Sequence, residues 1–234
     1  MPNPLAKGII VTITDTTIAD QVATLQRNSA GRLPEAVAAA FGGELAALAV
    51  AGVPDSIMAV GSPMPDGALL DVHGRPTTLA RARNGRPAVV VFYRGAWCPY
   101  CNITLRTYQQ ALVAALAARD TALIAISPQL PDGSLSMREK HDLTYIVVSD
   151  PGNQIAGQLG ILTAPGREVL AAQVSLGLDL TAINADGTPT IPMPTVVIVD
   201  AAGTLRWRDV HPHYTTRTEP GAILAALAAT LGPA

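Results

Sequence analysis

The sequence predicts an α/β domain that follows a helical extension. The first observation is a strand–helix–strand pattern, in which apolar runs at residues 88–93 and 122–127 flank a segment with helical spacing that starts at Pro99. This pattern indicates a parallel crossover connection, which is right-handed by the general rule. The second observation is a helical pattern that precedes a Pro/Gly-rich linker. The expected parts are an N-terminal helical extension, residues 1–59, and a main α/β domain, residues 60–234.

Length, charge and cysteine content predict a cytoplasmic enzyme. The 234 residues suffice for one large core, and 49% of them are hydrophobic, which argues against disorder. The net charge is -2 and lysines and arginines are not clustered, so the sequence predicts no basic patch that would bind nucleic acid or an anionic membrane. We find no secretory signal and no apolar run of roughly 18 residues that a membrane helix needs. Two cysteines form no disulfide framework, which agrees with a reducing compartment.

The extension is expected to contain two helices. Residues 1–13 read as a strand or a mobile arm, and an apolar helix face follows at Ile18, Val22 and Leu25. A second helix starts at Pro34 and is weakened in its middle by Gly42-Gly43, which can bend or split it. Because this second helix is apolar almost all round, we expect burial against the main domain or against a second subunit, so a homodimer is one expected outcome.

The main domain is expected to continue with alternating strands and helices. The elements predicted in order are a hairpin over residues 69–79 with His73 in its solvent-exposed turn, the strand–helix–strand unit, a short helix over 134–141, a strand over 145–149, a helix after the turn at 150–153, an insertion over 162–192 with one helical piece near 169–176, strands over 195–199 and 204–210, and a helix over 220–231.

The cysteine pair is the candidate reaction centre. Cys98 comes where the strand over 88–93 passes into the helix, and a helix N-terminus carries unpaired N–H groups and partial positive charge. Cysteines in Cys-X-X-Cys at this position have lowered pKa values, and Pro99 suits the first helical turn. Cys101 follows one turn later. We assign Cys98, expected to be the more exposed, as the attacking thiol and Cys101 as the resolving thiol.

The cysteine pair has two other interpretations, a zinc site and inert thiols. A structural zinc site needs four ligands, and no second Cys-X-X-Cys or His-X3-His exists. His211 and His213 could complete a set, but their spacing is too short for the usual pattern. The pair could also be inert core thiols. Redox chemistry is favoured over both, and no metal or other cofactor is expected.

Several phrases carry a family resemblance. Trp97-Cys98-Pro99-Tyr100-Cys101 after one apolar strand, and Met193-Pro194-Thr195 before another, resemble the thioredoxin superfamily over roughly residues 60–231. The phrases FYRGAWCPYC, ISPQ, VSDP and HYTTRTEP resemble its AhpC/TSA (peroxiredoxin-like) branch. The resemblance implies a thioredoxin-like fold, a central mixed β-sheet flanked by helices. It also implies a cis-proline at Pro194, with Met193 and Pro194 lining the thiol site; the alternative is an ordinary proline at the start of a strand.

The sequence departs from the peroxiredoxin pattern at two places. The Pro-X-X-X-Thr-X-X-Cys motif is replaced by Val91 and Gly95, so the hydroxyl that would bind peroxide is absent. Met193-Pro194 stands where those enzymes carry an arginine. Arg94 or Arg217 could stabilise the thiolate and the departing oxygen instead, unless both are surface cations. Trp97 and Tyr100 are expected to flank the sulfurs.

The leading functional hypothesis is a thiol-dependent peroxidase. The Cys98 thiolate would attack hydrogen peroxide or an organic hydroperoxide, become a sulfenic acid and condense with Cys101 to a disulfide, which an external thioredoxin- or glutathione-type thiol reduces. The rival hypothesis is a thioredoxin- or glutaredoxin-like oxidoreductase that acts on protein or glutathione disulfides. A binding module that kept the fold and lost turnover is a third.

Overall fold

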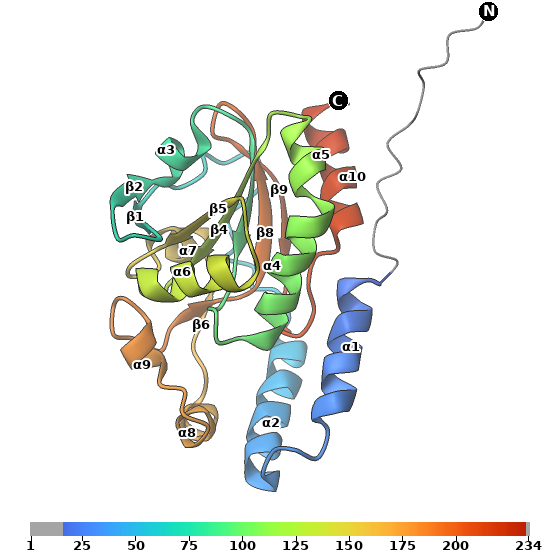
Figure 1. The fold of residues 1–234 in the computed structure, drawn as a ribbon, viewed down its shortest axis with the longest axis vertical. Coiled ribbons are helices and arrows are strands. Elements are labelled where there is room, and N and C mark those ends of the chain that lie inside the picture. Colours follow the sequence, from blue (N-terminus) through green and yellow to red (C-terminus); the bar gives the residue numbers. More distant parts are fainter. Residues whose placement is uncertain (1–15, 233–234) are drawn as a thin grey trace, which may run out of the picture.

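The computed structural model describes residues 16–232, so the interpretation of residues 1–13 lies outside the described part. A seven-stranded mixed sheet in the order β2-β1-β5-β4-β3-β8-β9 forms the centre, with helices on both faces (Figure 1). Its strands are β1 (Ala68–Asp71), β2 (Pro76–Thr78), β3 (Ala88–Phe92), β4 (Ala122–Ser127), β5 (Ile146–Ser149), β8 (Thr195–Val199) and β9 (Leu205–Val210).

The predicted crossover lies at the middle of the sheet. Strand β3 pairs in parallel with β4 and antiparallel with β8, and Val90 lies between Ile124 and Val197 in the register. Helices α4 (Pro99–Ala111) and α5 (Val113–Ala117), separated at Leu112, connect β3 to β4. Every residue of β3, β4 and β8 is buried, because helices cover both faces of the sheet.

Two apolar cores pack against the two faces of the sheet. One contains alternate β3 residues such as Val89 and Val91, together with side chains from α1 (Ile18–Ser29), α4, α6 (Pro131–Lys140) and α10 (Pro220–Leu231). The other contains Val90 and Phe92 with side chains from α3 (Leu79–Arg83) and α7 (Gln154–Leu159). The alternation follows from the two-residue period of a strand. Cys101 on α4 packs in the first core, on the same face of the sheet as Val89 and Val91.

Helix α1 is anchored to the main domain. Ile18 and Val22 are buried in the first core, and the Glu219 carboxylate accepts hydrogen bonds from the N–H groups of Ile18 (3.0 Å) and Ala19 (2.9 Å). A carboxylate at the first helical turn also complements the helix dipole. The division of the chain at residues 59 and 60 stays a prediction.

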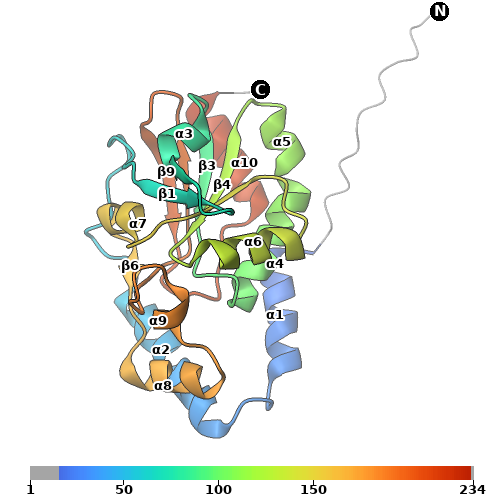
Figure 2. The same cartoon turned by 60° about the vertical axis from the view of Figure 1, so that its left-hand side comes forward.

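Helix α2 (Glu35–Ala51) runs without interruption through Gly42-Gly43, so the helix is not split there, and the bend stays a prediction. It lies against α8 (Arg167–Ser175), as Figures 1 and 2 show. Among its residues Val37 alone is buried, and Val50 is 90% exposed. The main domain thus covers only part of this apolar helix, and burial against a second subunit stays a prediction.

The insertion has more structure than its pattern predicted. Besides α8 it contains α9 (Leu180–Ile183) and a two-stranded sheet of β6 (Leu162–Thr163) and β7 (Ile191–Pro192). Elements of two to four residues are too short to show a period in the sequence. Helix α6 starts at Pro131, before the predicted residue, because proline suits a first helical turn.

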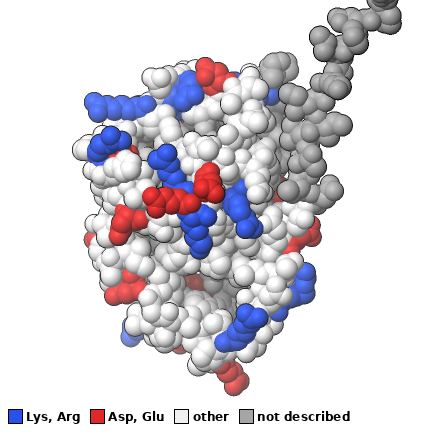
Figure 3. Space-filling model, in the orientation of Figure 1, with Lys and Arg blue, Asp and Glu red and all other residues white. Residues whose placement is uncertain are grey.

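The surface carries mixed charges on the face shown in Figure 3, where blue and red side chains alternate over the main domain. Such a mixture offers no extended basic region, which agrees with the small net charge of -2. No helix within residues 16–232 is both long and apolar enough to cross a membrane.

Candidate active site

The two cysteines lie at a strand–turn–helix junction, as predicted. Strand β3 ends at Phe92, Cys98 is the N-cap residue of α4, and Pro99 is the first residue of the helix. Both cysteines are free thiols. The chain therefore brings two sulfurs to the end of the central strand, one turn apart on the same helix.

Gln129, the last residue of the ISPQ phrase, holds the turn from the segment that follows β4. Its Oε1 accepts a hydrogen bond of 2.8 Å from the Ala96 N–H. Gly95 has a φ of +151°, and a Cβ there would lie 2.4 Å from Trp97 Nε1 and 2.9 Å from Gln129 Oε1. The close approach of Trp97 and Gln129 therefore requires glycine at position 95, where the peroxiredoxin pattern has a larger residue.

Asn102 closes the turn from the helix side. Its Nδ2 donates hydrogen bonds of 2.7 Å to the carbonyl oxygens of Ala96 and Cys98. His141 Nε2 lies 2.7 Å from Asn102 Oδ1, and burial, with nearby cations, lowers the pKa of His141. A neutral imidazole that donates from Nε2 fits this arrangement, because the Asn102 oxygen can only accept. The turn is thus fixed by side chains that sequence reasoning did not single out.

Burial and ionisation of the pair differ from the expectation. Cys98 and Cys101 are each 1% exposed, so the prediction of a more exposed Cys98 is wrong. Burial, a hydrogen bond with Cys101 and the charge on Cys101 raise the pKa of the Cys98 thiol well above its ordinary value. Burial also raises the pKa of Cys101, but the hydrogen bond from Cys98 and the Arg217 guanidinium outweigh it, and the net shift is well below the ordinary value. The surroundings of the pair therefore favour Cys101 over Cys98 as the site of the thiolate.

Arg217 supplies the cation for Cys101. Its Nη2 lies 3.5 Å from Cys101 Sγ, and its Nη1 donates to the carbonyl oxygens of Tyr214 and Thr216. Cys101, Arg217 and Pro194 line a small cavity of about 10 Å³, close to the space that one water needs. This cavity lies on the inner side of α4.

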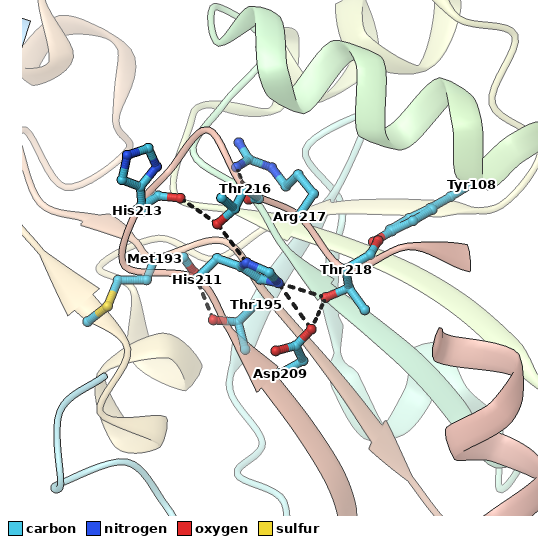
Figure 4. Close-up of polar contacts among 9 residues, drawn as sticks. All are labelled: Tyr108, Met193, Thr195, Asp209, His211, His213, Thr216, Arg217 and Thr218. Atoms are coloured by element: carbon cyan, nitrogen blue, oxygen red, sulfur yellow. Dashed lines mark hydrogen bonds and ion pairs between the residues drawn. The ribbon is translucent and has the colours of Figure 1, made fainter. Parts of the chain in front are cut away.

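A polar network holds the loop that carries Arg217 (Figure 4). His211 Nε2 lies 3.0 Å from Asp209 Oδ2, and the Thr218 hydroxyl donates to the same carboxylate oxygen at 2.9 Å. The hydrogen bond from His211 is the largest influence on the Asp209 carboxyl and lowers its pKa. The buried Tyr108 hydroxyl donates to the Thr218 carbonyl at 2.7 Å, which ties the loop to α4. The HYTTRTEP phrase drew attention to this loop as part of the family resemblance, but only the fold shows the hydrogen bonds that hold it.

Arg94 is a buried cation rather than a surface one. Its side chain is 4% exposed, and its Cζ lies 3.9 Å from the Tyr214 ring centroid and 5.0 Å from that of Trp97. Cation–π contacts of this kind stabilise a guanidinium within about 6 Å of a ring. Arg94 acts on the charge of Cys98 and lowers the pKa of that thiol, against the larger effect of burial.

Cys98 opens onto a groove of about 730 Å³ that α1, α2, the 173–183 segment and the active-site turn enclose. We call it the Cys98 groove, and its largely apolar walls include Leu25, Phe41, Leu45, Trp97, Leu178 and Ile183. Pro99, Tyr100 and Arg94 also line it. Trp97 and Tyr100 are thus brought beside Cys98. The adjacent Tyr93 belongs to the apolar core, and burial raises its pKa to about 12.

Of the two residues expected to line the thiol site, Pro194 lines the small cavity beside Cys101, whereas Met193 does not. No peptide bond in the described residues is cis, so the cis-proline expected at position 194 is a wrong prediction. Pro194 directly precedes β8, and its carbonyl accepts a hydrogen bond of 2.9 Å from the His211 N–H, which extends the antiparallel pairing of β8 with β9. Met193 packs in the second core on the other face of the sheet, away from both cavities. Residues 16–232 contain no cluster of three or more His, Cys, Asp or Glu suited to a metal.

Comparison with known proteins decides the family. The model of the AhpC/TSA family matches residues 60–208, more than half of the chain. The chain belongs to the AhpC/TSA family. This confirms the resemblance drawn from the cysteine phrase, and this AhpC/TSA protein is accordingly an oxidoreductase. No protein of curated function matches the sequence at a significant level.

Solved structures share the fold at low sequence identity. Peroxidoxin BcpB from Mycobacterium tuberculosis is 20% identical, with a TM-score of 0.56 over 76% of this chain and 99% of that protein. Reduced Prx3 in complex with hydrogen peroxide, from Vibrio vulnificus, is 17% identical, with a TM-score of 0.59 over 73% and 99%. AhpC from Mycobacterium tuberculosis is 16% identical, with a TM-score of 0.55 over 74% and 93%. The AhpC/TSA protein thus has the predicted thioredoxin-like fold. Family and fold support a thiol peroxidase or thioredoxin-like redox role.

Proposed function

We propose that the protein is a thiol-dependent peroxidase in which Cys98 attacks the peroxide and Cys101 resolves the product. The observation that carries this proposal is the position of two free thiols one turn apart at the start of α4, with Arg217 Nη2 3.5 Å from Cys101 Sγ. Cys98 lines a groove that a substrate can enter, and the pKa of Cys101, beside Arg217, is shifted well below its ordinary value. One end of the groove therefore combines Cys98 as the reactive sulfur with Cys101 as the base for its proton, and the groove itself is the path for the substrate.

The proposed reaction starts with proton transfer from the Cys98 thiol to the Cys101 thiolate. The Cys98 thiolate then attacks the terminal peroxide oxygen, so that an S–O bond forms, the O–O bond breaks and the leaving alkoxide or hydroxide takes the proton that Cys101 received. Cys98 is then a sulfenic acid. The Cys101 thiolate attacks it, the S–O bond breaks, the leaving hydroxide takes a proton from solvent to become water, and a disulfide forms. In sum, two thiols are oxidised and one peroxide is reduced.

The two arginines have separate proposed roles. Arg217, 3.5 Å from Cys101, stabilises a thiolate on Cys101. Arg94 lies in the groove wall near Cys98, where a buried cation can stabilise charge that develops on the departing oxygen. Together they would replace the hydroxyl and the arginine that the peroxiredoxin pattern has elsewhere.

An external thiol must return the disulfide to the dithiol, and we propose a thioredoxin- or glutathione-type reductant. We also propose a cytoplasmic location, because a dithiol cycle of this kind needs a reducing compartment. A homodimer is proposed from the exposed apolar side of α2, where Val50 is 90% exposed. No cofactor takes part in the proposed cycle.

Stopped-flow fluorescence of Trp97 tests the proposal, because this ring lines the same groove as Cys98. The reduced protein is mixed separately with hydrogen peroxide, an organic hydroperoxide and oxidised glutathione, and Cys98→Ser is the control. We expect a fast change with a peroxide that Cys98→Ser lacks. Equal peroxide consumption by the wild type and by Cys98→Ser would overturn the proposal.

The second candidate function is thiol–disulfide exchange, favoured by the Cys-Pro-Tyr-Cys spacing and by Gly95, which leaves no hydroxyl for a peroxide. In that case Cys98 attacks a disulfide sulfur and forms a mixed disulfide, which Cys101 releases. Fast reaction with oxidised glutathione and slow reaction with every peroxide in the same experiment would establish it instead.

A further inference from the structure

Helix α1 connects the two elements that bring Arg217 to Cys101, namely α4 and the loop that carries the arginine. It lies beside α4, as Figures 1 and 2 show, and Gln21 Nε2 donates a hydrogen bond of 3.1 Å to Thr107 Oγ1 on that helix. At its N-terminus α1 meets the loop through the Glu219 carboxylate. Both sides of the contact between Arg217 and Cys101 are therefore attached to one helix.

The Glu219 carboxylate serves α1 rather than the helix that it precedes. Glu219 is the N-cap residue of α10, yet among the described residues its side chain forms no cap hydrogen bond to that helix. Instead Oε2 accepts from the Ile18 N–H (3.0 Å) and Oε1 from the Ala19 N–H (2.9 Å). The first N–H groups of a helix have no partner within it, and its dipole favours a negative charge there. Both carboxylate oxygens are thus used to hold α1.

Only one residue separates Glu219 from Arg217. This residue, Thr218, is tied to α4, because its carbonyl accepts a hydrogen bond of 2.7 Å from the Tyr108 hydroxyl. The Arg217 guanidinium donates to backbone carbonyls of its own loop, so it moves with that loop. Its Nη2 lies 3.5 Å from Cys101 Sγ, and an attraction between charges weakens as their distance grows. A displacement of the loop at Glu219 would therefore weaken the hold of Arg217 on Cys101.

Neither end of this connection lies in the part of the chain that matches the AhpC/TSA family, residues 60–208, because α1 precedes it and Glu219 follows it. We infer that Glu219 is a positioning residue, which uses α1 to hold the Arg217 guanidinium beside the Cys101 sulfur. The inference rests on the role proposed for Arg217 and makes α1 a part of that role.

The test measures the ionisation of Cys101 by thiolate absorbance in a Cys98→Ser background, in which Cys101 is the only cysteine left. Glu219→Gln removes the charge and one of the two acceptor oxygens. The titration midpoint of Cys101 should rise by about one pH unit, because the guanidinium stabilises the thiolate less well. Loss of a negative charge would by itself lower the midpoint, so the direction of the change separates positioning from a simple charge effect.

Ala19→Pro tests the same contact from the side of α1 and changes no charge. Proline removes the N–H that Glu219 Oε1 accepts from, and it is tolerated in a first helical turn. The Cys101 midpoint should therefore rise in this variant too. A rise in Glu219→Gln without a rise in Ala19→Pro would contradict a role for α1.

Asp150→Asn is the matched control. The Asp150 carboxylate also accepts hydrogen bonds from the first two residues of a helix, in this case α7, both at 2.9 Å. Helix α7 packs in the second core, on the other face of the sheet from Cys101. This variant should lower the urea midpoint of unfolding, as Glu219→Gln does, but it should leave the Cys101 midpoint unchanged.

Three further results would overturn the inference. One is an unchanged or lowered Cys101 midpoint in Glu219→Gln, and another is an equal rise in Asp150→Asn, which would assign the effect to lost stability. The third is a Cys98→Ser parent whose Cys101 titrates near the ordinary thiol value of about 8.5, which would also remove the role proposed for Arg217. The titration uses no peroxide. Failure of the proposed peroxidase function is therefore seen separately, as a wild type that reacts with no peroxide although the midpoints shift as expected.

Discussion

Cys98 and Cys101 lie one helical turn apart with equal burial, yet their pKa values shift in opposite directions. Cys98 is at the N-cap of α4, where the helix dipole favours a thiolate, but its sulfur faces apolar groove walls. Cys101 is inside the helix and contacts Arg217, a residue 116 positions further along the chain. The hydrogen bond from Cys98 and the adjacent Arg217 cation thus outweigh desolvation at Cys101, whereas nothing outweighs it at Cys98.

The largest expected effect separates the two cysteines by role. Cys98→Ser should lower peroxide turnover by a factor on the order of 10³ or more, as loss of a catalytic nucleophile usually does. Cys101→Ser should still be oxidised once, but its recycling should be slow, since the resolving sulfur is gone. Single-turnover oxidation and steady-state peroxide consumption measure the two steps. Full single-turnover activity in Cys98→Ser would reverse the assignment.

Removing the cation that distinguishes Cys101 should have the next largest effect. Arg217→Gln raises the pKa of Cys101 because the guanidinium no longer stabilises its thiolate, and oxidation at pH 7 should slow by roughly tenfold or more. Thiolate absorbance during a pH titration measures the shift. Arg75→Gln, which removes an exposed arginine paired with Asp71, is the matched control and should change neither quantity.

The pH dependence of the wild type sharpens the comparison. A thiolate with a lowered pKa is present above that pKa and is lost only as the pH falls through it. The oxidation rate should therefore stay constant as the pH falls past the ordinary thiol pKa of about 8.5, and decline only at lower pH. A rate that instead rises tenfold per pH unit near that value would mean that Cys98 ionises without help from Cys101.

The smallest expected effect concerns the loop that carries Arg217. Tyr108→Phe removes the hydrogen bond to the Thr218 carbonyl and should lower the free energy of unfolding by about 1 kcal/mol. Tyr145→Phe removes a similar buried hydrogen bond, to the Leu105 carbonyl at 3.0 Å, and should cost about as much. Only Tyr108→Phe should also slow oxidation, by a few-fold at most. Equal oxidation rates in the two variants would show that the loop does not depend on this anchor.

The sequence alone determined the α/β order, the crossover around β3 and the place of Cys98 at a helix start. These features depend on local periodicity, on apolar runs and on residues such as Pro99, whose effect extends over a few neighbours. For the same reason the helix over Pro220–Leu231 was predicted with its observed bounds. The family resemblance rested on contiguous phrases of the same local kind.

Only the tertiary structure decided which cations and hydrogen bonds surround each sulfur. That outcome depends on how far Arg217 lies from Cys101, on the burial of Arg94 and on the anchors of distant loops. The pairing of the Pro194 carbonyl with the His211 N–H across two strands is likewise something that no local pattern reveals. The Cys98 groove is likewise enclosed by the N-terminal helices and the insertion, separate stretches of chain that only folding brings together. Charge interactions and cavity walls depend on distances between residues in the folded chain, whereas sequence patterns report only on residues that are close along the chain.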